Sequence, residues 1–95
     1  NYETFEVRLI NLSLHGACLE ILNEELRWDV GDHLSITTPE HFQHGAVVRW
    51  IKATANKVLV GVLFDHDLNL PLQIVSIHQV WSIFRNTRPN QFALQ

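Results

Sequence analysis

The sequence ETFEVRLI-NLSLHG-ACLEIL, residues 3–22, consists of two alternating runs joined by a short polar loop. In the first run Phe5, Val7 and Leu9 alternate with other side chains, which is the two-residue period of a strand with one buried face. The second run, residues 17–22, alternates in the same way. The stretch therefore predicts two neighbouring strands and places the loop between them at one edge of a sheet.

The two-residue period continues to about residue 65 and predicts a mainly β fold. Three further strands are expected, each bounded by turn residues: 33–37, 42–53 and 58–64. Five antiparallel strands within about residues 3–65 favour a small barrel or sandwich. In the longest strand we expect Val48 and Trp50 on the same side, with the Trp50 ring packed inside the barrel.

The period changes after Asp67. Large apolar side chains then recur at spacings of three and four residues, as on one face of an α-helix: Leu70, Ile74, Ile77, Trp81 and Phe84. Asn69 can cap the start, so we expect a C-terminal helix over about residues 69–87. Because such a stripe is too apolar for water, we expect it to dock on the barrel and to contribute to a homo-oligomer interface.

Length and composition indicate one domain over residues 1–95. The chain has no long apolar run and no charged leader, so neither a membrane span nor a signal peptide is expected. Cys18 is the single cysteine, which excludes an internal disulfide and fits a reducing compartment such as the cytoplasm. Because the chain lacks methionine and begins at Asn1, we expect it to be part of a longer protein.

The charge distribution argues against nucleic acid as a partner. The net charge is −3, and the seven Lys and Arg residues are scattered, whereas a nucleic-acid surface needs them gathered into a patch. A small anionic ligand remains compatible, since one or two local arginines are sufficient to bind it.

Signatures of catalysis are not found in the sequence. No Gly-rich phosphate loop follows a strand, and no Gly-x-Ser-x-Gly elbow occurs. His41 and His44 are the closest histidine pair, but Pro39 and the strand that follows keep them from sharing a helix face, and no further ligands complete a metal site. We therefore expect no enzyme activity, no metal and no cofactor.

The loop at residues 11–16 carries short polar groups suited to a ligand. Asn11 has an amide that donates and accepts, Ser13 has a hydroxyl, and Gly16 has no Cβ in the way. Such groups can read the edge of a planar heterocycle or hold an anionic oxygen. The alternative is an ordinary hairpin loop in which Asn and Ser bond their own backbone and Gly supplies a positive φ. His15 can bond a ligand or face solvent.

The order of motifs resembles that of the PilZ domain family. Residues 11–21 are similar to its Asp/Asn-x-Ser-x-x-Gly signature, followed by a small residue and an apolar strand. Three later segments resemble a Gly-Asp strand opening, a strand ending in an aromatic residue and a Gly-Val-x-Phe strand, in the family's order: residues 30–36, 45–50 and 60–64. The resemblance covers nearly the whole chain and includes a helix after the last of these strands.

This resemblance implies a small antiparallel β-barrel of the split-barrel type with a C-terminal α-helix. It also implies a regulatory domain in the bacterial cytoplasm that binds the second messenger cyclic di-GMP and relays the signal to an attached domain or protein partner. By resemblance, Asn11, Ser13 and Gly16 contact a guanine and its ribose-phosphate. Arg8 lies on the strand that leads into the motif, where it either approaches a phosphate or faces solvent.

One feature departs from the family pattern. Family members that bind well carry an Arg-x-x-x-Arg pair well before the Asn-x-Ser motif, whereas Arg8 is the only arginine before Asn11 in this sequence. Three explanations stay open. The pair lies upstream in the parent protein, or the family's first strand is missing as well. In the third explanation, the chain is a divergent member that has lost the messenger and serves protein–protein interaction.

Overall fold

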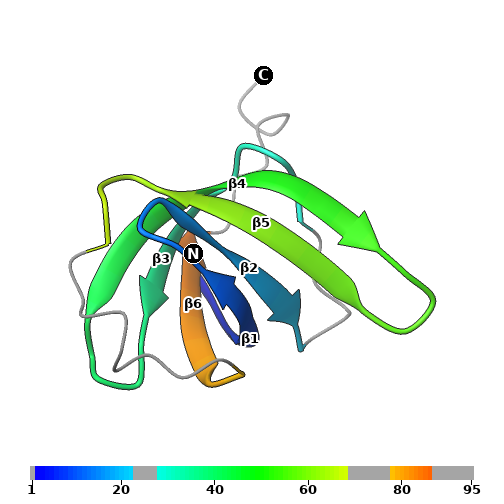
Figure 1. Cartoon of the computed structure of the whole chain (residues 1–95), viewed down its shortest axis with the longest axis horizontal. Helices are drawn as coiled ribbons and strands as arrows, with labels where there is room; N and C mark the ends of the chain where they lie inside the picture. The colour runs from blue at the N-terminus through cyan, green and yellow to red at the C-terminus, as the bar shows by residue number, and fades with distance from the viewer. Residues whose placement is uncertain (1, 23–27, 69–77, 87–95) are drawn as a thin grey trace.

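The computed structural model describes residues 2–22, 28–68 and 78–86, which form a closed antiparallel barrel (Figure 1). The strands follow one another along the chain as β1 (Tyr2–Leu12), β2 (Gly16–Ile21), β3 (His33–Thr37), β4 (Gln43–Ala53), β5 (Val58–Phe64) and β6 (Val80–Asn86). Around the barrel their order is β1-β2-β5-β4-β3-β6. The prediction of a mainly β fold built as a small barrel is confirmed.

Strand β1 closes the barrel because it is paired along both of its edges. On one edge it pairs with β2, from Val7 opposite Ile21 to Leu12 opposite Ala17. On the other edge it pairs with β6, from Tyr2 opposite Asn86 to Arg8 opposite Val80. The chain therefore joins its first and last described strands directly, and in Figure 1 the blue and orange ribbons lie side by side.

The barrel interior is filled by one inward row of apolar side chains from each strand. The largest fully buried members are Trp81, Leu9, Leu19, Ile36, Ile83, Val7, Val48 and Val60. The alternation expected for β1, β2, β3 and β5 is confirmed by their buried residues. The strand bounds differ slightly from the expected ones, since Asn11 lies in β1 and Gly16 begins β2.

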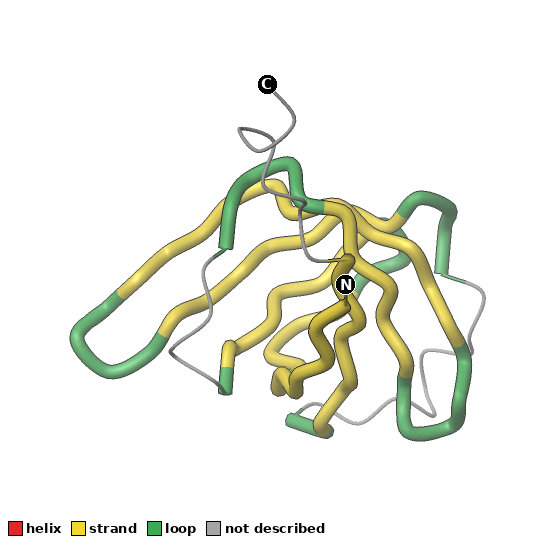
Figure 2. The backbone as a smooth tube through the Cα atoms, turned by 180° about the vertical axis from the view of Figure 1, so that it is seen from behind, coloured by secondary structure: helices red, strands yellow, loops and turns green. Residues whose placement is uncertain are grey.

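The expected C-terminal helix is wrong for the segment 80–86, which forms strand β6 (Figure 2). Trp81 and Ile83 are buried in the barrel, while Val80 and Phe84 are 38% and 42% exposed. Residues 69–77 and 87 of the expected helix, including Asn69, Leu70, Ile74 and Ile77, lie outside the described residues. Of the two stripe residues that the structure describes, Trp81 lies inside the barrel and Phe84 is exposed, so they do not share one helical face. The homo-oligomer contact expected of this segment stays a prediction.

The expected position of Trp50 inside the barrel is also wrong. Val48 pairs with Val62 and is fully buried, but Trp50 pairs with the next residue of β5, Gly61, and is 45% exposed. Arg49 is therefore the extra residue of a β-bulge. The bulge reverses the alternation along β4, so that Trp50 faces outward and Ile51 packs against the core.

A buried ion pair fixes the chain that enters β3. Arg85 Nη1 lies 3.3 Å from Asp32 Oδ2, and their side chains are 11% and 5% exposed. The guanidinium also lies over the rings of Phe5 and Trp28, at 5.5 and 5.2 Å from their centroids. Asp32 follows Gly31, whose φ of 96° provides the turn. The positive charge of Arg85, near the end of β6, is therefore neutralised by Asp32 in the segment before β3.

Trp81→Ala should lower the free energy of unfolding by about 3–5 kcal/mol, because it leaves a large cavity in the barrel interior. Trp81→Phe should cost much less, since it keeps an aromatic ring in the core and removes an indole N–H that has no hydrogen-bond partner among the described residues. Urea denaturation followed by circular dichroism measures both. A loss below about 1 kcal/mol for Trp81→Ala would contradict a core position for this ring.

Candidate functional site

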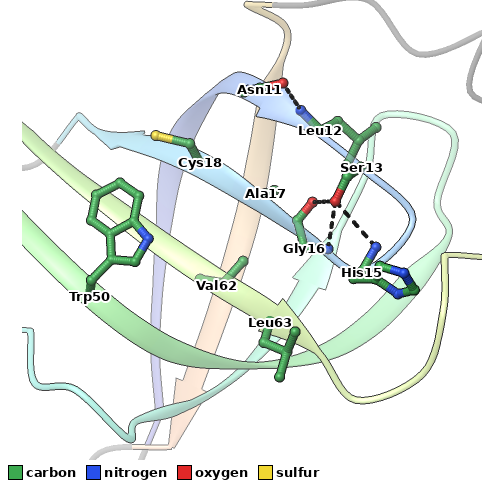
Figure 3. A pocket seen from close by; sticks show the side chains of 10 residues that line it. All are labelled: Asn11, Leu12, Ser13, His15, Gly16, Ala17, Cys18, Trp50, Val62 and Leu63. Carbon is green, nitrogen blue, oxygen red and sulfur yellow. Dashed lines mark hydrogen bonds between the residues drawn. The ribbon is translucent and has the colours of Figure 1, made fainter.

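An open groove of about 320 Å³ runs across the outer face of the barrel beside the loop that joins β1 and β2 (Figure 3). Its lining comes from β1, the loop, β2, β4 and β5: Asn11, Leu12, Ser13, His15, Gly16, Ala17, Cys18, Trp50, Val62 and Leu63. Four of the five residues predicted for a ligand site are thus brought together, and Arg8 is the one outside the lining. The volume lies at the lower end of the range for small-molecule sites.

Strand register aligns the centre of the groove in one row across four strands. Trp50 on β4 lies opposite Gly61 on β5, Gly61 lies opposite Cys18 on β2, and Cys18 lies opposite Asn11 on β1. Because neighbouring strands are about 4.8 Å apart, Trp50 and Asn11 stand at opposite ends of a row about 14 Å long. The row joins an aromatic surface at one end to an amide at the other.

The Trp50 indole lies directly over the backbone of Gly61. A Cβ placed on Gly61 would collide with Cε2 and Nε1 of the indole. The glycine therefore makes room for a large ring to lie against the sheet, with one side supported by backbone and nearly half of its surface exposed. This arrangement is a rigid aromatic platform. The feature of the sequence that could indicate this platform is Gly61, a residue without a side chain that pairs with an aromatic residue on the neighbouring strand.

Ser13 holds the loop together with its hydroxyl. Ser13 Oγ accepts hydrogen bonds from the backbone N–H of His15 at 3.3 Å and of Gly16 at 3.2 Å. The backbone N–H of Ser13 donates to the Gly16 carbonyl at 2.9 Å. The local hydrogen bonding expected of an ordinary hairpin loop is therefore present at Ser13, and this side chain shapes the rim of the groove.

Asn11 uses only part of its amide locally. Its Oδ1 accepts a hydrogen bond from the Leu12 N–H at 2.8 Å. Within the described part of the chain no partner is found for its Nδ2, and the residue is exposed. The amide oxygen is therefore fixed by the backbone, which leaves two N–H donors for a bound molecule.

Gly16 is required for close approach and not for a positive φ. Among the described glycines only Gly31 has a positive φ, so that part of the hairpin-loop interpretation is wrong. A Cβ on Gly16 would instead collide with the carbonyl oxygen of Val62 on β5. The absence of a side chain lets the start of β2 lie tightly against β5, directly below the groove.

His15 is held at the end of the groove by the segment that follows β5. Its Nδ1 lies 2.9 Å from Asp67 Oδ1, and both side chains are about 70% exposed. Its carbonyl accepts a hydrogen bond from Phe64 N–H at 2.7 Å, and the Leu14 carbonyl accepts one from Leu68 N–H at 2.7 Å. These contacts anchor the loop to β5, with His15 and Trp50 at opposite ends of the view in Figure 3.

A second row of outward side chains runs parallel to the first. Lys52 lies opposite Leu59, Leu59 lies opposite Glu20, and Glu20 lies opposite Arg8. Arg8 Nη1 is 3.6 Å from Glu20 Oε1. This row places two cations beside the groove but outside its lining, and one of them is paired with a carboxylate.

The comparison with known families is consistent with this geometry. The family model for the PilZ domain matches residues 1–79. The chain belongs to the PilZ domain family. PilZ domains are a family of non-catalytic regulatory domains that bind cyclic di-GMP. The comparisons with curated proteins and with solved structures give no significant match.

The PilZ match covers β1 to β5 and stops just before β6. The motif at Asn11–Gly16 and the Trp50 platform therefore both lie in the matched part. In this PilZ domain, burial raises the pKa of the Cys18 thiol, so the thiol in the centre of the groove is protonated and is a poor nucleophile.

Among residues 2–22, 28–68 and 78–86, no three His, Cys, Asp or Glu side chains are grouped so as to hold a metal ion. The same residues contain no helix with the length and apolar character needed to cross a membrane.

Gly16→Ala should destabilise the barrel by about 1–3 kcal/mol, because the new methyl group meets a backbone oxygen that cannot move without disturbing the pairing of β2 with β5. Thermal unfolding gives the change. Gly31→Ala is the matched comparison, because a Cβ there meets nothing within 4 Å and its cost comes from the positive φ. An unchanged melting temperature for Gly16→Ala would contradict the close approach.

Proposed function

We propose that this PilZ domain is a cytoplasmic receptor module that binds cyclic di-GMP in the groove between Asn11 and Trp50. It relays the signal to an attached domain or protein partner. The observation that carries the proposal is the row Trp50-Gly61-Cys18-Asn11, which joins an aromatic platform to amide donors next to the family motif. The messenger carries two guanine bases, each with an aromatic face and a hydrogen-bonding edge, and this row offers a stacking partner at one end and a hydrogen-bonding partner at the other.

Stacking on Trp50 contributes affinity in this proposal. The ring is supported from below by Gly61 and exposed on its outer side, so little conformational freedom is lost when a base stacks on it. Base–aromatic stacking contributes about 1–3 kcal/mol per base. The half-buried Leu12 and the exposed Leu63 add apolar surface elsewhere in the lining of the groove.

Hydrogen bonds from the loop give selectivity in this proposal. The Asn11 Nδ2 donors suit the guanine carbonyl and ring-nitrogen acceptors. Ser13 acts mainly by fixing the loop, because its hydroxyl already accepts two backbone N–H groups. A base that does not match these donors leaves buried polar groups unpaired, which lowers its affinity.

The phosphates of the messenger meet cations from the second row. Arg8 and Lys52 stand on the same outward face as the groove, one row away from Asn11 and Trp50. An arginine is well suited to this role, because its planar guanidinium binds phosphate through two parallel hydrogen bonds. An Arg-x-x-x-Arg pair supplied by the parent protein would add to these two cations.

Trp50→Ala and Asn11→Ala should each weaken cyclic di-GMP binding by about 1–3 kcal/mol, through loss of stacking and of hydrogen bonds respectively. Ser13→Ala should weaken it through a looser loop. Isothermal titration calorimetry with the parent protein measures the affinities.

Phe42→Ala is the matched control for Trp50, since Phe42 is equally exposed at 44% but lies outside the groove. It should leave the affinity unchanged. If wild type binds and both groove variants bind as tightly, the messenger site lies elsewhere. No binding by wild type would instead favour a protein-interaction module.

A further inference from the structure

The ion pair between Arg8 and Glu20 lies beside the groove and engages a cation that the ligand would need. The two residues face each other across β1 and β2, with Arg8 Nη1 3.6 Å from Glu20 Oε1. The Arg8 side chain is 41% exposed and the Glu20 side chain 21% exposed. The pair is therefore partly open to water and can be broken at small cost.

Arg8 can reach the groove when it leaves Glu20. Glu20 and Cys18 are two residues apart on the same outward face of β2, which corresponds to about 6.6 Å along the strand. Arg8 is opposite Glu20, and Asn11 is opposite Cys18. The Arg8 guanidinium therefore needs to move only from the row of Glu20 to the neighbouring row of Cys18. Arginine has the longest flexible side chain among the cationic residues of this face.

Glu20 also stands between two cations of the second row. In the register of the second row, Glu20 separates Arg8 on β1 from Lys52 on β4, with Leu59 beside it. Among the ten lining residues of the groove there is no Lys or Arg. A dianionic ligand therefore depends on cations beside the groove, and there the Glu20 carboxylate is paired with Arg8.

We infer that Glu20 sets the affinity of the groove for its anionic ligand by competing with the ligand phosphate for Arg8. The inference rests on the proposed function and identifies a residue outside the family motif that regulates the same site. Glu20 holds Arg8 when the groove is empty. A bound phosphate replaces Glu20 as the ion-pair partner of Arg8. The free energy of the lost Arg8–Glu20 pair therefore reduces the net free energy of ligand binding.

Removal of the competing charge should tighten binding. Calorimetry of the parent protein with cyclic di-GMP should give about a two- to fivefold lower Kd for Glu20→Gln than for wild type at low salt, because an exposed pair contributes little on its own. The gain should shrink as ionic strength rises. Glu40→Gln is the control, since it removes the same charge from the exposed turn between β3 and β4, and it should leave Kd unchanged.

A double-mutant cycle with Arg8→Gln separates competition for Arg8 from simple repulsion. In the Arg8→Gln background, Glu20→Gln should have little effect. An equal gain in that background, an equal gain in Glu40→Gln, or an unchanged Kd in Glu20→Gln overturns the inference while leaving the proposed function intact. Binding by Glu20→Gln where wild type shows none supports the inference, and absence of binding in both overturns the inference together with the proposed function.

Discussion

Closure of the barrel by β1 is the constraint on which the other features depend. One strand pairs with β2 and with β6, so its inward residues Val7 and Leu9 are fully buried between both neighbours. Its outward residues are then fixed in the same register, which places Arg8 opposite Glu20 and Asn11 opposite Cys18. The strand that seals the core therefore also carries the first residues of the groove. The fold and the proposed ligand site therefore depend on the same set of backbone hydrogen bonds.

In β1, β2 and β3 the buried and exposed residues differ in polarity, so their two-residue period can be recognised in the sequence. β6 is an exception, because its outward residues Val80 and Phe84 are apolar like the inward Trp81 and Ile83. Apolar residues at 80, 81, 83 and 84 match a helical stripe as well as they match a strand. The inward-facing Arg85 makes the strand still harder to predict. Its partner Asp32 is 53 residues away in sequence, so no local pattern shows that this charge can be buried.

The candidate site was predictable where a motif carries it and unpredictable where strand pairing creates it. Asn11, Ser13, His15 and Gly16 are adjacent in sequence, and the structure places them at one groove. Trp50 reaches the same groove only because the bulge at Arg49 turns it outward, and no local pattern marks this bulge. Gly61 shows the same dependence, since the need for a small residue there arises from a ring on the neighbouring strand.

The different surroundings of the three tryptophans make the groove visible by fluorescence. Trp28 and Trp81 are 9% and 1% exposed, so their indoles are shielded from solvent, whereas Trp50 is 45% exposed at the groove. Indole emission shifts to longer wavelength in water, and a stacked base quenches it. The red-edge emission of the protein therefore comes mainly from Trp50, and a collisional quencher such as iodide acts mainly on this ring. Occupancy of the groove is in this way reported by an intrinsic chromophore, without any label on the protein.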